Sequence, residues 1–289
     1  MTCGNRLQDE GRVAVEASQL TPQEFEHFQT LIFQLSGIRV PENKVMLLSN
    51  RIRRRVKATG VTDFRAYLKL IRSPAGREEL EGFFNAVTTN ETSFFRTEKH
   101  FDWLRTEFVD EMRARLRSGQ HPRHVRIWSA ACSSGEEPYS IAMCLAENRS
   151  RLTDCKFEIH GTDISEDSLT KARAGVYGSH VTEEVPESLQ TRYFDHKPGS
   201  AEWKVKASLT EFVTVFRHNL MEANRQQDYD CIFIRNVLIY FSRESKKVVI
   251  DNLVRSLAVG GYLLVGPSEG IFDMLGMLQK RSTFLYQKT

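Results

Sequence analysis

The stretch from Trp128 to Ser140, with the sequence WSAACSSGEEPYS, most constrains the fold of this chain. It predicts an apolar strand that runs into small residues and Gly135, and then into a helix with Pro138 in its first turn. Small residues let a backbone approach a ligand closely, and a helix N-terminus offers unpaired N–H groups. This arrangement is typical of α/β folds that bind nucleotide-like cofactors at the end of a strand.

The same stretch departs from the glycine fingerprint of dinucleotide-binding enzymes. It lacks the Gly-x-Gly-x-x-Gly pattern, and it places Glu136 and Glu137 where such an enzyme would hold a pyrophosphate. Carboxylates repel phosphate and suit a cationic ligand without phosphate. S-adenosylmethionine fits that description and NAD does not. The stretch therefore disfavours an NAD-dependent dehydrogenase.

The pattern of helices and strands along the chain predicts two domains. Residues 1–18 are polar and are expected to be a disordered leader, and residues 19–88 are expected to form an all-helical domain. Residues 89–120 are expected to form a linker and a connecting helix. Residues 121–289 predict an α/β domain, within which residues 176–210 interrupt the alternation as an inserted lobe with a small sheet.

Capping signals and apolar periodicity locate the helices before residue 120. Thr21-Pro-Gln-Glu24 predicts a capping box that opens a helix, with Gly37 as its stop. The next helix, from about Asn43 to Ala58, is expected to bury one stripe and to end at Gly60. The stripe expected to be buried consists of Val45, Leu48, Ile52 and Val56. Further helices are expected at residues 62–72, 77–88 and 97–118.

Short apolar runs predict a mostly parallel sheet covered by helices after residue 120. A last strand at about 283–287 is expected to pair antiparallel at one edge. The expected parallel strands are 124–130, 157–162, 212–217, 230–235 and 261–266. The expected helices between them are 137–149, 166–173 and 243–258.

Composition excludes several classes of protein. No apolar stretch approaches the roughly 20 residues that span a bilayer, and the polar N-terminus lacks the apolar core of a signal peptide. The cysteines are scattered and lack Cys-x-x-Cys spacing, which predicts reduced thiols in a cytoplasmic protein and no metal site. They are Cys3, Cys132, Cys144, Cys155 and Cys231.

Positive charge is concentrated in one helix. The range from Lys44 to Lys57 holds six cations and no acid, although the whole chain carries a net charge of only +3. The remainder of the chain is therefore net negative. A local basic face indicates a docking surface, and argues against a protein that coats polyanions generally.

Two strand tips offer candidate contacts to an adenosine. Asp163 ends the second strand and could accept both ribose hydroxyls, or it could be the N-cap of the next helix. Asn219 ends the third strand and could contact the adenine edge, or it could be a turn residue. The sequence alone leaves both pairs of alternatives open.

The segment that joins the two domains and the tip of the fourth strand carry further candidates. Phe94 and Phe95 are expected to pack in a core, whereas the planar fork of Arg96 suits a carboxylate. The fourth strand ends in Arg235-Asn236-Val-Leu-Ile-Tyr240-Phe. It lacks the (Asn/Asp)-Pro-Pro-(Tyr/Phe) motif of the enzymes that methylate nucleobase amines, and this disfavours that activity.

Taken together, these motifs resemble the chemotaxis-receptor glutamate O-methyltransferases of the CheR family. The resemblance covers nearly all of the chain from about residue 20, in order and at the expected separations. It implies an N-terminal helical domain, a linker, and a Rossmann-like methyltransferase domain with a small β-subdomain. The motifs that carry it are Thr89-Asn90-x-Thr92-x-Phe94-Phe95-Arg96, Ser129 to Ser140, Asp163-Ile164 and Arg235-Asn236-Val-x-Ile-Tyr240-Phe241.

The resemblance also implies the site residues, with no metal. Arg96 and Tyr240 are implied at the methyl-transfer site. The residues implied to contact S-adenosylmethionine are Asn90, Thr92, Arg96, Glu137, Asp163, Asn219, Leu220, Asn236 and Val237. The cations implied to dock on the receptor are Arg51, Arg53, Arg54, Arg55 and Lys57.

The activity implied by the resemblance is methyl transfer from S-adenosylmethionine to glutamates of the cytoplasmic helical bundle of chemotaxis receptors. The other product is S-adenosylhomocysteine, and the resemblance implies neither a nucleic-acid partner nor membrane insertion. The turn within residues 193–205 is short and has only Gly199, which predicts independence of the C-terminal pentapeptide tether that some relatives recognise. The alternatives are a nucleic-acid methyltransferase whose arginine helix contacts phosphates, and a non-catalytic adaptor that binds the cofactor.

Overall fold

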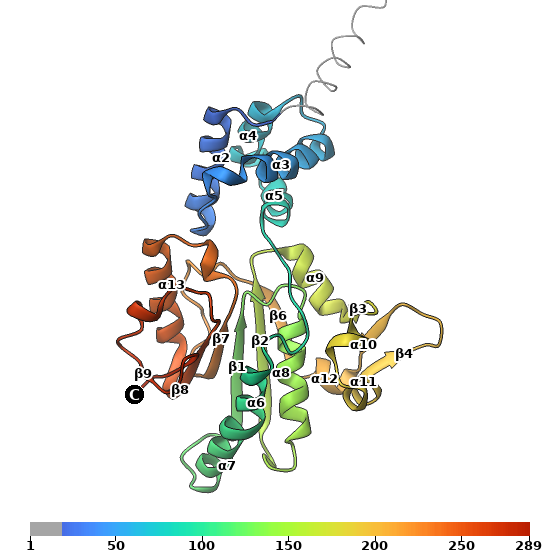
Figure 1. Ribbon diagram of the computed structural model, residues 1–289, viewed down its shortest axis with the longest axis vertical. Helices are drawn as coiled ribbons and strands as arrows, with labels where there is room; N and C mark the ends of the chain where they lie inside the picture. Colours follow the sequence, from blue (N-terminus) through green and yellow to red (C-terminus); the bar gives the residue numbers. More distant parts are fainter. Residues whose placement is uncertain (1–18) are drawn as a thin grey trace, which may run out of the picture. The chain divides into compact units, whose positions relative to one another are not determined.

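The computed structural model describes residues 19–289, and the chain divides into two compact units (Figure 1). The first unit extends to Thr89 and also includes residues 240–245. The second unit comprises residues 90–239 and 246–289. The expected leader at residues 1–18 lies outside the described residues. Within residues 19–289, no helix has the length and apolar character needed to cross a bilayer.

The first unit is helical, and its helices begin and end at the predicted signals. Thr21 Oγ1 accepts the N–H of Glu24, and Glu24 Oε2 accepts the N–H of Thr21 at 3.0 Å, so the capping box is confirmed. Gly37 and Gly60 end two helices with φ +72°, in the left-handed region that favours glycine. The elements are α2 (Pro22–Ser36), η1 (Glu42–Lys44), α3 (Val45–Thr59), α4 (Phe64–Arg72), η2 (Pro74–Gly76) and α5 (Glu79–Val87).

Aromatic side chains form the core of the first unit. Phe28 of α2, Tyr67 of α4 and Phe83 of α5 are fully buried, with ring centroids 6.2–6.4 Å apart. Aromatic pairs at such distances add to the free energy of burial. The aliphatic stripe predicted on α3 packs in the same core and consists of Leu48, Ile52 and Val56, with Val45 partly buried.

The connecting helix expected over residues 97–118 has an irregular middle. It consists of α6 (Glu98–Trp103), a π-helical turn η3 (Leu104–Phe108) and α7 (Val109–Arg117). A π turn inserts an extra residue, which apolar periodicity does not reveal. The connecting helix belongs to the second unit, where its Phe101 packs against Phe233 of the sheet at a centroid distance of 6.1 Å.

The second unit is built on a seven-stranded sheet in the order β6-β2-β1-β7-β8-β10-β9. The first five strands in this order are parallel, so their carboxyl ends share one edge. The predicted Rossmann-like sheet is thus confirmed. The strands are β1 (His124–Ala130), β2 (Lys156–Asp163), β6 (Val213–Arg217), β7 (Tyr229–Ile234), β8 (Leu257–Val265), β9 (Gln279–Lys280) and β10 (Leu285–Gln287).

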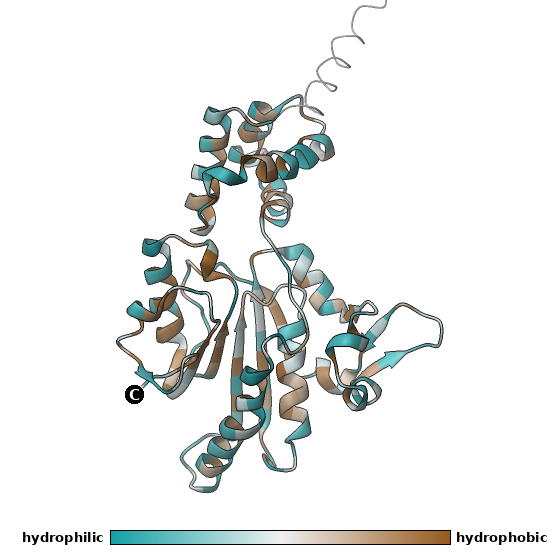
Figure 2. Ribbon diagram, in the orientation of Figure 1, coloured by the Kyte–Doolittle hydropathy of each residue, from teal (hydrophilic) through white to brown (hydrophobic). Residues whose placement is uncertain are grey.

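Helices cover the sheet and bury its central strands. Every residue of β7 is buried, as expected for a parallel strand covered on both faces, and Figure 2 shows most of its length as hydrophobic. Figure 1 shows α8 lying along the sheet, where it packs on β1 and β2. The helices that follow β1, β2 and β7 are α8 (Glu136–Glu147), α9 (Glu166–Ala174) and α13 (Arg243–Ser256).

The predicted edge position of the last strand is wrong in one respect. β10 pairs antiparallel with β8, as predicted, but its other side pairs with β9, which occupies the edge. β9 consists of two exposed polar residues, Gln279 and Lys280. Such a short polar edge strand carries no apolar alternation, so the sequence pattern does not indicate it.

The lobe predicted at residues 176–210 contains the expected small sheet. Its strands β3 (Val176–Tyr177), β5 (Trp203–Val205) and β4 (Phe194–His196) are antiparallel in that order. His196 and Trp203 stack across β4 and β5 with centroids 3.9 Å apart. Three short helices complete the lobe, α10 (Val181–Glu184), α11 (Glu187–Tyr193) and α12 (Ala207–Thr210).

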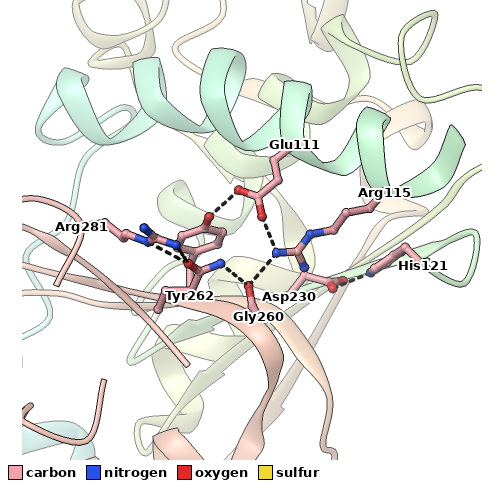
Figure 3. Close-up of polar contacts among 8 residues, drawn as sticks. Glu111, Arg115, His121, Asp230, Gly260, Tyr262 and Arg281 are labelled. Carbon is pink, nitrogen blue, oxygen red and sulfur yellow. Dashed lines mark hydrogen bonds and ion pairs between the residues drawn. The ribbon is translucent and has the colours of Figure 1, made fainter. Parts of the chain in front are cut away.

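A polar network ties α7 to the sheet (Figure 3). Glu111 accepts hydrogen bonds from the hydroxyl of Tyr262 and from the guanidinium of Arg115. Arg115 and the Gln287 side chain both donate to the carbonyl of Gly260 at 3.0 Å. Gly260 has φ +79°, and a Cβ there would lie 3.0 Å from the Arg115 guanidinium. The positive φ favours glycine here, and a larger residue would also displace the Arg115 guanidinium.

Candidate functional site

The strand order places a topological switch point beside β1. β2 and β6 lie on one side of β1, whereas β7 and β8 lie on the other, so successive connections leave in opposite directions. Ligands of open α/β sheets bind in the crevice outside the carboxyl ends of the strands at such a point. Ala130 at the end of β1 pairs with Thr162 of β2 and Ile234 of β7. The loops after these three strands therefore adjoin one another.

The loop after β1 has an unusual backbone. Ala131, Ser133 and Gly135 all have positive φ, at +61°, +49° and +97°. A Cβ on Gly135 would lie 2.8 Å from Ala172 Cβ and 3.0 Å from the Tyr177 hydroxyl. Glycine is thus needed here for the backbone conformation and for packing on α9 and β3, a reason that is independent of ligand approach.

Asp163 joins the end of β2 to the loop after β1. Its Oδ2 accepts the N–H of Ser133 and its Oδ1 accepts the N–H of Ser165, both at 2.9 Å. The N-cap of α9 is Ser165, whose Oγ accepts the N–H of Ser168, so the alternative role of Asp163 as that N-cap is wrong. Burial raises the pKa of Asp163, although backbone hydrogen bonds oppose the shift.

The segment from Asn90 to Thr97 is fastened to the same loops. The Asn90 carbonyl accepts the Ser133 hydroxyl at 2.7 Å, and Asn90 Nδ2 donates to Ser165 Oγ at 3.2 Å. The N–H of Phe95 donates to Ser140 Oγ of α8 at 3.0 Å. This segment therefore lies against the crevice, as the predicted role of Asn90 requires.

The two phenylalanines of this segment pack in the core, as predicted. Both Phe94 and Phe95 are buried, and the Phe94 ring contacts Tyr177 and Phe194 edge-on at 4.9 and 5.6 Å. Thr92, one of the implied cofactor contacts, is half-buried.

Arg96 lies between two residues with strained backbones. Phe95 and Thr97 have φ of +50° and +66°, a region that residues other than glycine rarely occupy. Arg96 itself is half-buried, and its Nη1 donates to the carbonyl of Glu91 at 3.1 Å. Strained backbone of this kind persists where the surroundings fix it, and it is frequent at functional sites.

The surroundings that fix Arg96 include Arg235, which also binds Glu137. Arg235 Nη2 donates to the Arg96 carbonyl and, at 3.3 Å, to Thr97 Oγ1. Its Nη1 lies 3.1 Å from Glu137 Oε2, and Ser129 donates to Glu137 Oε1 at 2.7 Å. The two charged side chains are 2% and 13% exposed. Glu137 is therefore already neutralised, although its oxygens retain further acceptor positions.

Glu136, the other acid of the pocket predicted to suit a cationic ligand, also has a hydrogen-bond partner. It is buried and accepts the Ser134 hydroxyl at 2.8 Å. Burial raises the pKa of Glu136. Glu137 is thus paired with a cation and Glu136 with a hydroxyl donor, so both acids already have partners within the protein.

The tip of β6 carries Asn219 and Leu220. Asn219 Oδ1 accepts the N–H of Met221 at 3.1 Å, so this residue does serve the turn. Leu220 is buried, and its carbonyl accepts Asn252 Nδ2 at 3.1 Å. Contact of Asn219 or Leu220 with an adenine stays a prediction.

The tip of β7 leads to the last implied site residues. Asn236 has φ +57°, and Asn236 and Val237 are half-buried. Tyr240 belongs to the first unit, where its carbonyl accepts the N–H of Arg39 at 2.8 Å. The next residue, Phe241, forms an isolated antiparallel bridge with Ile38.

Two of the five cations implied to dock on a receptor have structural roles in the first unit. Arg51 donates to the Val87 carbonyl at 2.5 Å and to Thr89 Oγ1 at 3.1 Å. Arg55 forms two hydrogen bonds with Glu79, at 2.8 and 2.6 Å. These arginines fasten α3 to α5 and to the chain that follows it.

The remaining cations share one face of α3 with apolar side chains. Because successive residues are 100° apart around a helix axis, the six residues of this face, named below, cover an arc of roughly 120°. Arg54 and Lys57 are exposed there, and Met46 and Leu47 are 66% and 44% exposed. We call this surface the α3 outer face; it comprises Met46, Leu47, Asn50, Arg53, Arg54 and Lys57.

Sequence reasoning missed residues that support the site from outside its motifs. Arg235 was part of a recognised motif, but its ion pair with Glu137 was not expected. Glu269 was not singled out, and its carboxylate accepts the N–H groups of Asn236 and Leu238. Its position four residues after the end of β8 was the available signal, because the carboxyl ends of parallel strands meet at one edge.

The parallel sheet, its switch point and the acid at the tip of β2 define the fold of the S-adenosylmethionine-dependent methyltransferases. Residues 90–285 match the family model described as "CheR methyltransferase, SAM binding domain". Residues 23–88 match the model described as "CheR methyltransferase, all-alpha domain". The chain therefore belongs to the CheR methyltransferase family, and its cofactor is S-adenosylmethionine.

Similarity to curated relatives extends over most of the chain. It is 36% identical over 276 residues to the chemotaxis protein methyltransferase of Escherichia coli, covering 94% of this chain and 92% of that protein. The relative from Salmonella typhimurium is 35% identical over 272 residues, covering 92% and 90%. A further relative, from Pseudomonas putida, is 35% identical over 272 residues, covering 91% and 97%.

Proposed function

We propose that this methyltransferase converts specific glutamates of chemotaxis receptors to methyl esters, with S-adenosylhomocysteine as the second product. The observation that carries the proposal is the match of both parts of the chain, in order, to the two CheR family models. The names of the curated relatives, all chemotaxis protein methyltransferases, support it. We place the activity in the cytoplasm, at the receptor arrays.

The residues of the crevice fit S-adenosylmethionine. Each oxygen of Asp163 accepts a backbone hydrogen bond and keeps further acceptor positions, which suit the hydroxyls of a ribose. When bound, S-adenosylmethionine supplies an electrophilic methyl group on a sulfonium. The residues proposed to hold it are Asn90, Thr92, Arg96, Glu137, Asp163, Asn219, Leu220, Asn236 and Val237.

The proposed reaction needs orientation more than proton transfer. A glutamate side chain has an ordinary pKa near 4.3, so at neutral pH it is already the attacking anion and needs no general base. Because its charge disappears in the reaction, strong stabilisation of the anion would slow the transfer. We propose that Arg96 and Tyr240 orient the carboxylate through hydrogen bonds. Alignment of this kind can supply roughly 7–11 kcal/mol of the barrier.

A direct experiment tests the proposed function. The protein is incubated with tritiated S-adenosylmethionine and membranes that contain candidate receptors, and base-labile methanol is then measured. Receptor methyl esters should release their label as methanol. Label in RNA or DNA would favour a nucleic-acid methyltransferase, and cofactor binding without any turnover would favour an adaptor.

The α3 outer face is proposed to dock on the receptor, together with residues 19–88 that carry it. We expect the double reversal Arg54→Glu/Lys57→Glu to lower the rate of receptor methylation about tenfold at low receptor concentration, because complementary charge accelerates encounter. S-adenosylhomocysteine affinity should be unchanged. Initial rates and calorimetry measure the two quantities.

The matched control is Lys69→Glu/Arg72→Glu on α4, which makes the same charge change at exposed positions of the same unit. Equal losses in both variants would show a general charge effect and remove the docking role. Reversal of Arg55 is avoided, because it would break the contact with Glu79 and confuse docking with stability.

Tether-independent action is the finer part of the proposal. The connection between β4 and β5 spans residues 197–202, and Gly199 is its single glycine. We expect no saturable heat when the C-terminal pentapeptide of a receptor is titrated into the protein. A relative with a longer glycine-rich turn serves as the positive control, and measurable affinity in this chain would contradict the expectation.

A further inference from the structure

A buried carboxylate lies outside every motif of the proposed site and holds its last loop. Glu269 is 0% exposed, and its two oxygens accept backbone N–H groups of the loop after β7. Oε1 accepts the N–H of Asn236, and Oε2 accepts the N–H of Leu238 at 2.7 Å. An ionised group without contact to water is costly to bury unless it is fully hydrogen-bonded. The presence of a buried carboxylate at this position therefore calls for a structural or functional explanation.

The surrounding chain is arranged to admit this side chain. A Cβ on Gly266 would lie 2.5 Å from Glu269 Oε1, 3.2 Å from the Cα of Arg235 and 3.3 Å from the nitrogen of Asn236. Only glycine at position 266 leaves room for the carboxylate beside β7. Lys246 Nζ donates to the Glu269 carbonyl at 2.7 Å and fixes the backbone from α13.

The loop that Glu269 holds has a conformation that it would not adopt unaided. Asn236 has φ +57°, so its N–H and the N–H of Leu238 turn toward one point. Without an acceptor there, both donors would be buried and unsatisfied. The carboxylate therefore determines the shape of residues 236–238, two of which are proposed cofactor contacts.

We propose that Glu269 is a positioning residue for cofactor binding, which sets the loop of Asn236 and Val237 from the loop after the neighbouring strand β8. This inference rests on the proposed role of that loop. Glu269 does not need to touch the cofactor. Its effect is transmitted through two backbone hydrogen bonds, so it should depend on the number of acceptor oxygens and not on side-chain volume.

The test compares Glu269→Gln with Glu269→Ala in the full chain. Glutamine preserves volume but presents an NH₂ to one of the two N–H donors. We expect the dissociation constant of this variant for S-adenosylhomocysteine, measured by calorimetry, to rise at least tenfold. Urea unfolding of the same variant checks that it is folded under these conditions. In Glu269→Ala, added formate should restore affinity, because it supplies two acceptor oxygens, whereas chloride at equal ionic strength should not.

The possible outcomes separate this inference from the proposed function. Wild-type affinity in a folded Glu269→Gln variant would overturn the inference, as would a loss in Glu269→Ala that formate does not reverse. If neither variant folds, Glu269 supports the whole unit and the positioning role is likewise refuted. Failure of the wild-type protein to methylate receptors would refute the proposed function, whereas the role of Glu269 is judged by cofactor affinity alone.

Discussion

Replacement of Asp163 by alanine should weaken S-adenosylhomocysteine binding at least about 100-fold. Hydrogen bonds to a charged group contribute about 1.5–3 kcal/mol each, and about 1.4 kcal/mol is a factor of ten. Two ribose hydroxyls therefore account for the expected loss. The substitution also releases the N–H groups of Ser133 and Ser165, which shape the loop after β1. Calorimetry on the purified protein measures the change.

Two variants make this result interpretable. Asp163→Asn keeps the volume and one acceptor oxygen, so its loss should be smaller than that of alanine. Asp195→Ala removes an exposed carboxylate from β4 and should leave affinity unchanged. Near-normal binding by a folded Asp163→Ala variant would exclude this residue from the ribose role.

Replacement of Arg235 by methionine should cost about 3–5 kcal/mol of the free energy of unfolding. The substitution leaves the largely buried Glu137 side chain, which is 13% exposed, without its cation, and removing one partner of a buried ion pair typically costs this much. It also frees the Arg96 carbonyl, so cofactor affinity should fall together with stability. Urea unfolding followed by circular dichroism measures the first quantity.

A double variant isolates the ion pair. Glu137→Gln removes the uncompensated charge, so Arg235→Met/Glu137→Gln should regain a large part of the stability lost by Arg235→Met alone. This is the pattern expected of coupled neighbours in a double-mutant cycle. Simple additivity of the two single changes would show that the pair is not energetically coupled.

Local signals in the sequence predicted the elements of the fold well. The capping box at Thr21, the stops at Gly37 and Gly60, and the buried run of β7 each follow from a few adjacent residues. The π turn at residues 104–108 and the two-residue edge strand β9 were not predictable in this way. The first is marked by no glycine or proline within residues 98–117, and the second has no apolar residue to repeat.

The site was predicted less completely, because its support comes from residues far apart in the chain. Asp163, predicted at the tip of the second strand, and Asn90, implied by the resemblance, both contact Ser133 in the loop after β1. Motif spacing could not show that Arg235 neutralises Glu137, or that Glu269 shapes the loop at Asn236. The resemblance implied the same docking role for five cations of α3, whereas Arg55 is hydrogen-bonded to Glu79. Such facing relations depend on tertiary packing.

The excursion of residues 240–245 into the first unit has a practical consequence for dissecting this enzyme. The polypeptide passes between the units at three places, after residues 89, 239 and 245. A fragment that ends at Thr89 would lack the backbone partners of Ile38 and Arg39. Either unit expressed alone would therefore lose this native pairing, and a two-piece version that keeps it would need the hexapeptide grafted onto the helical fragment.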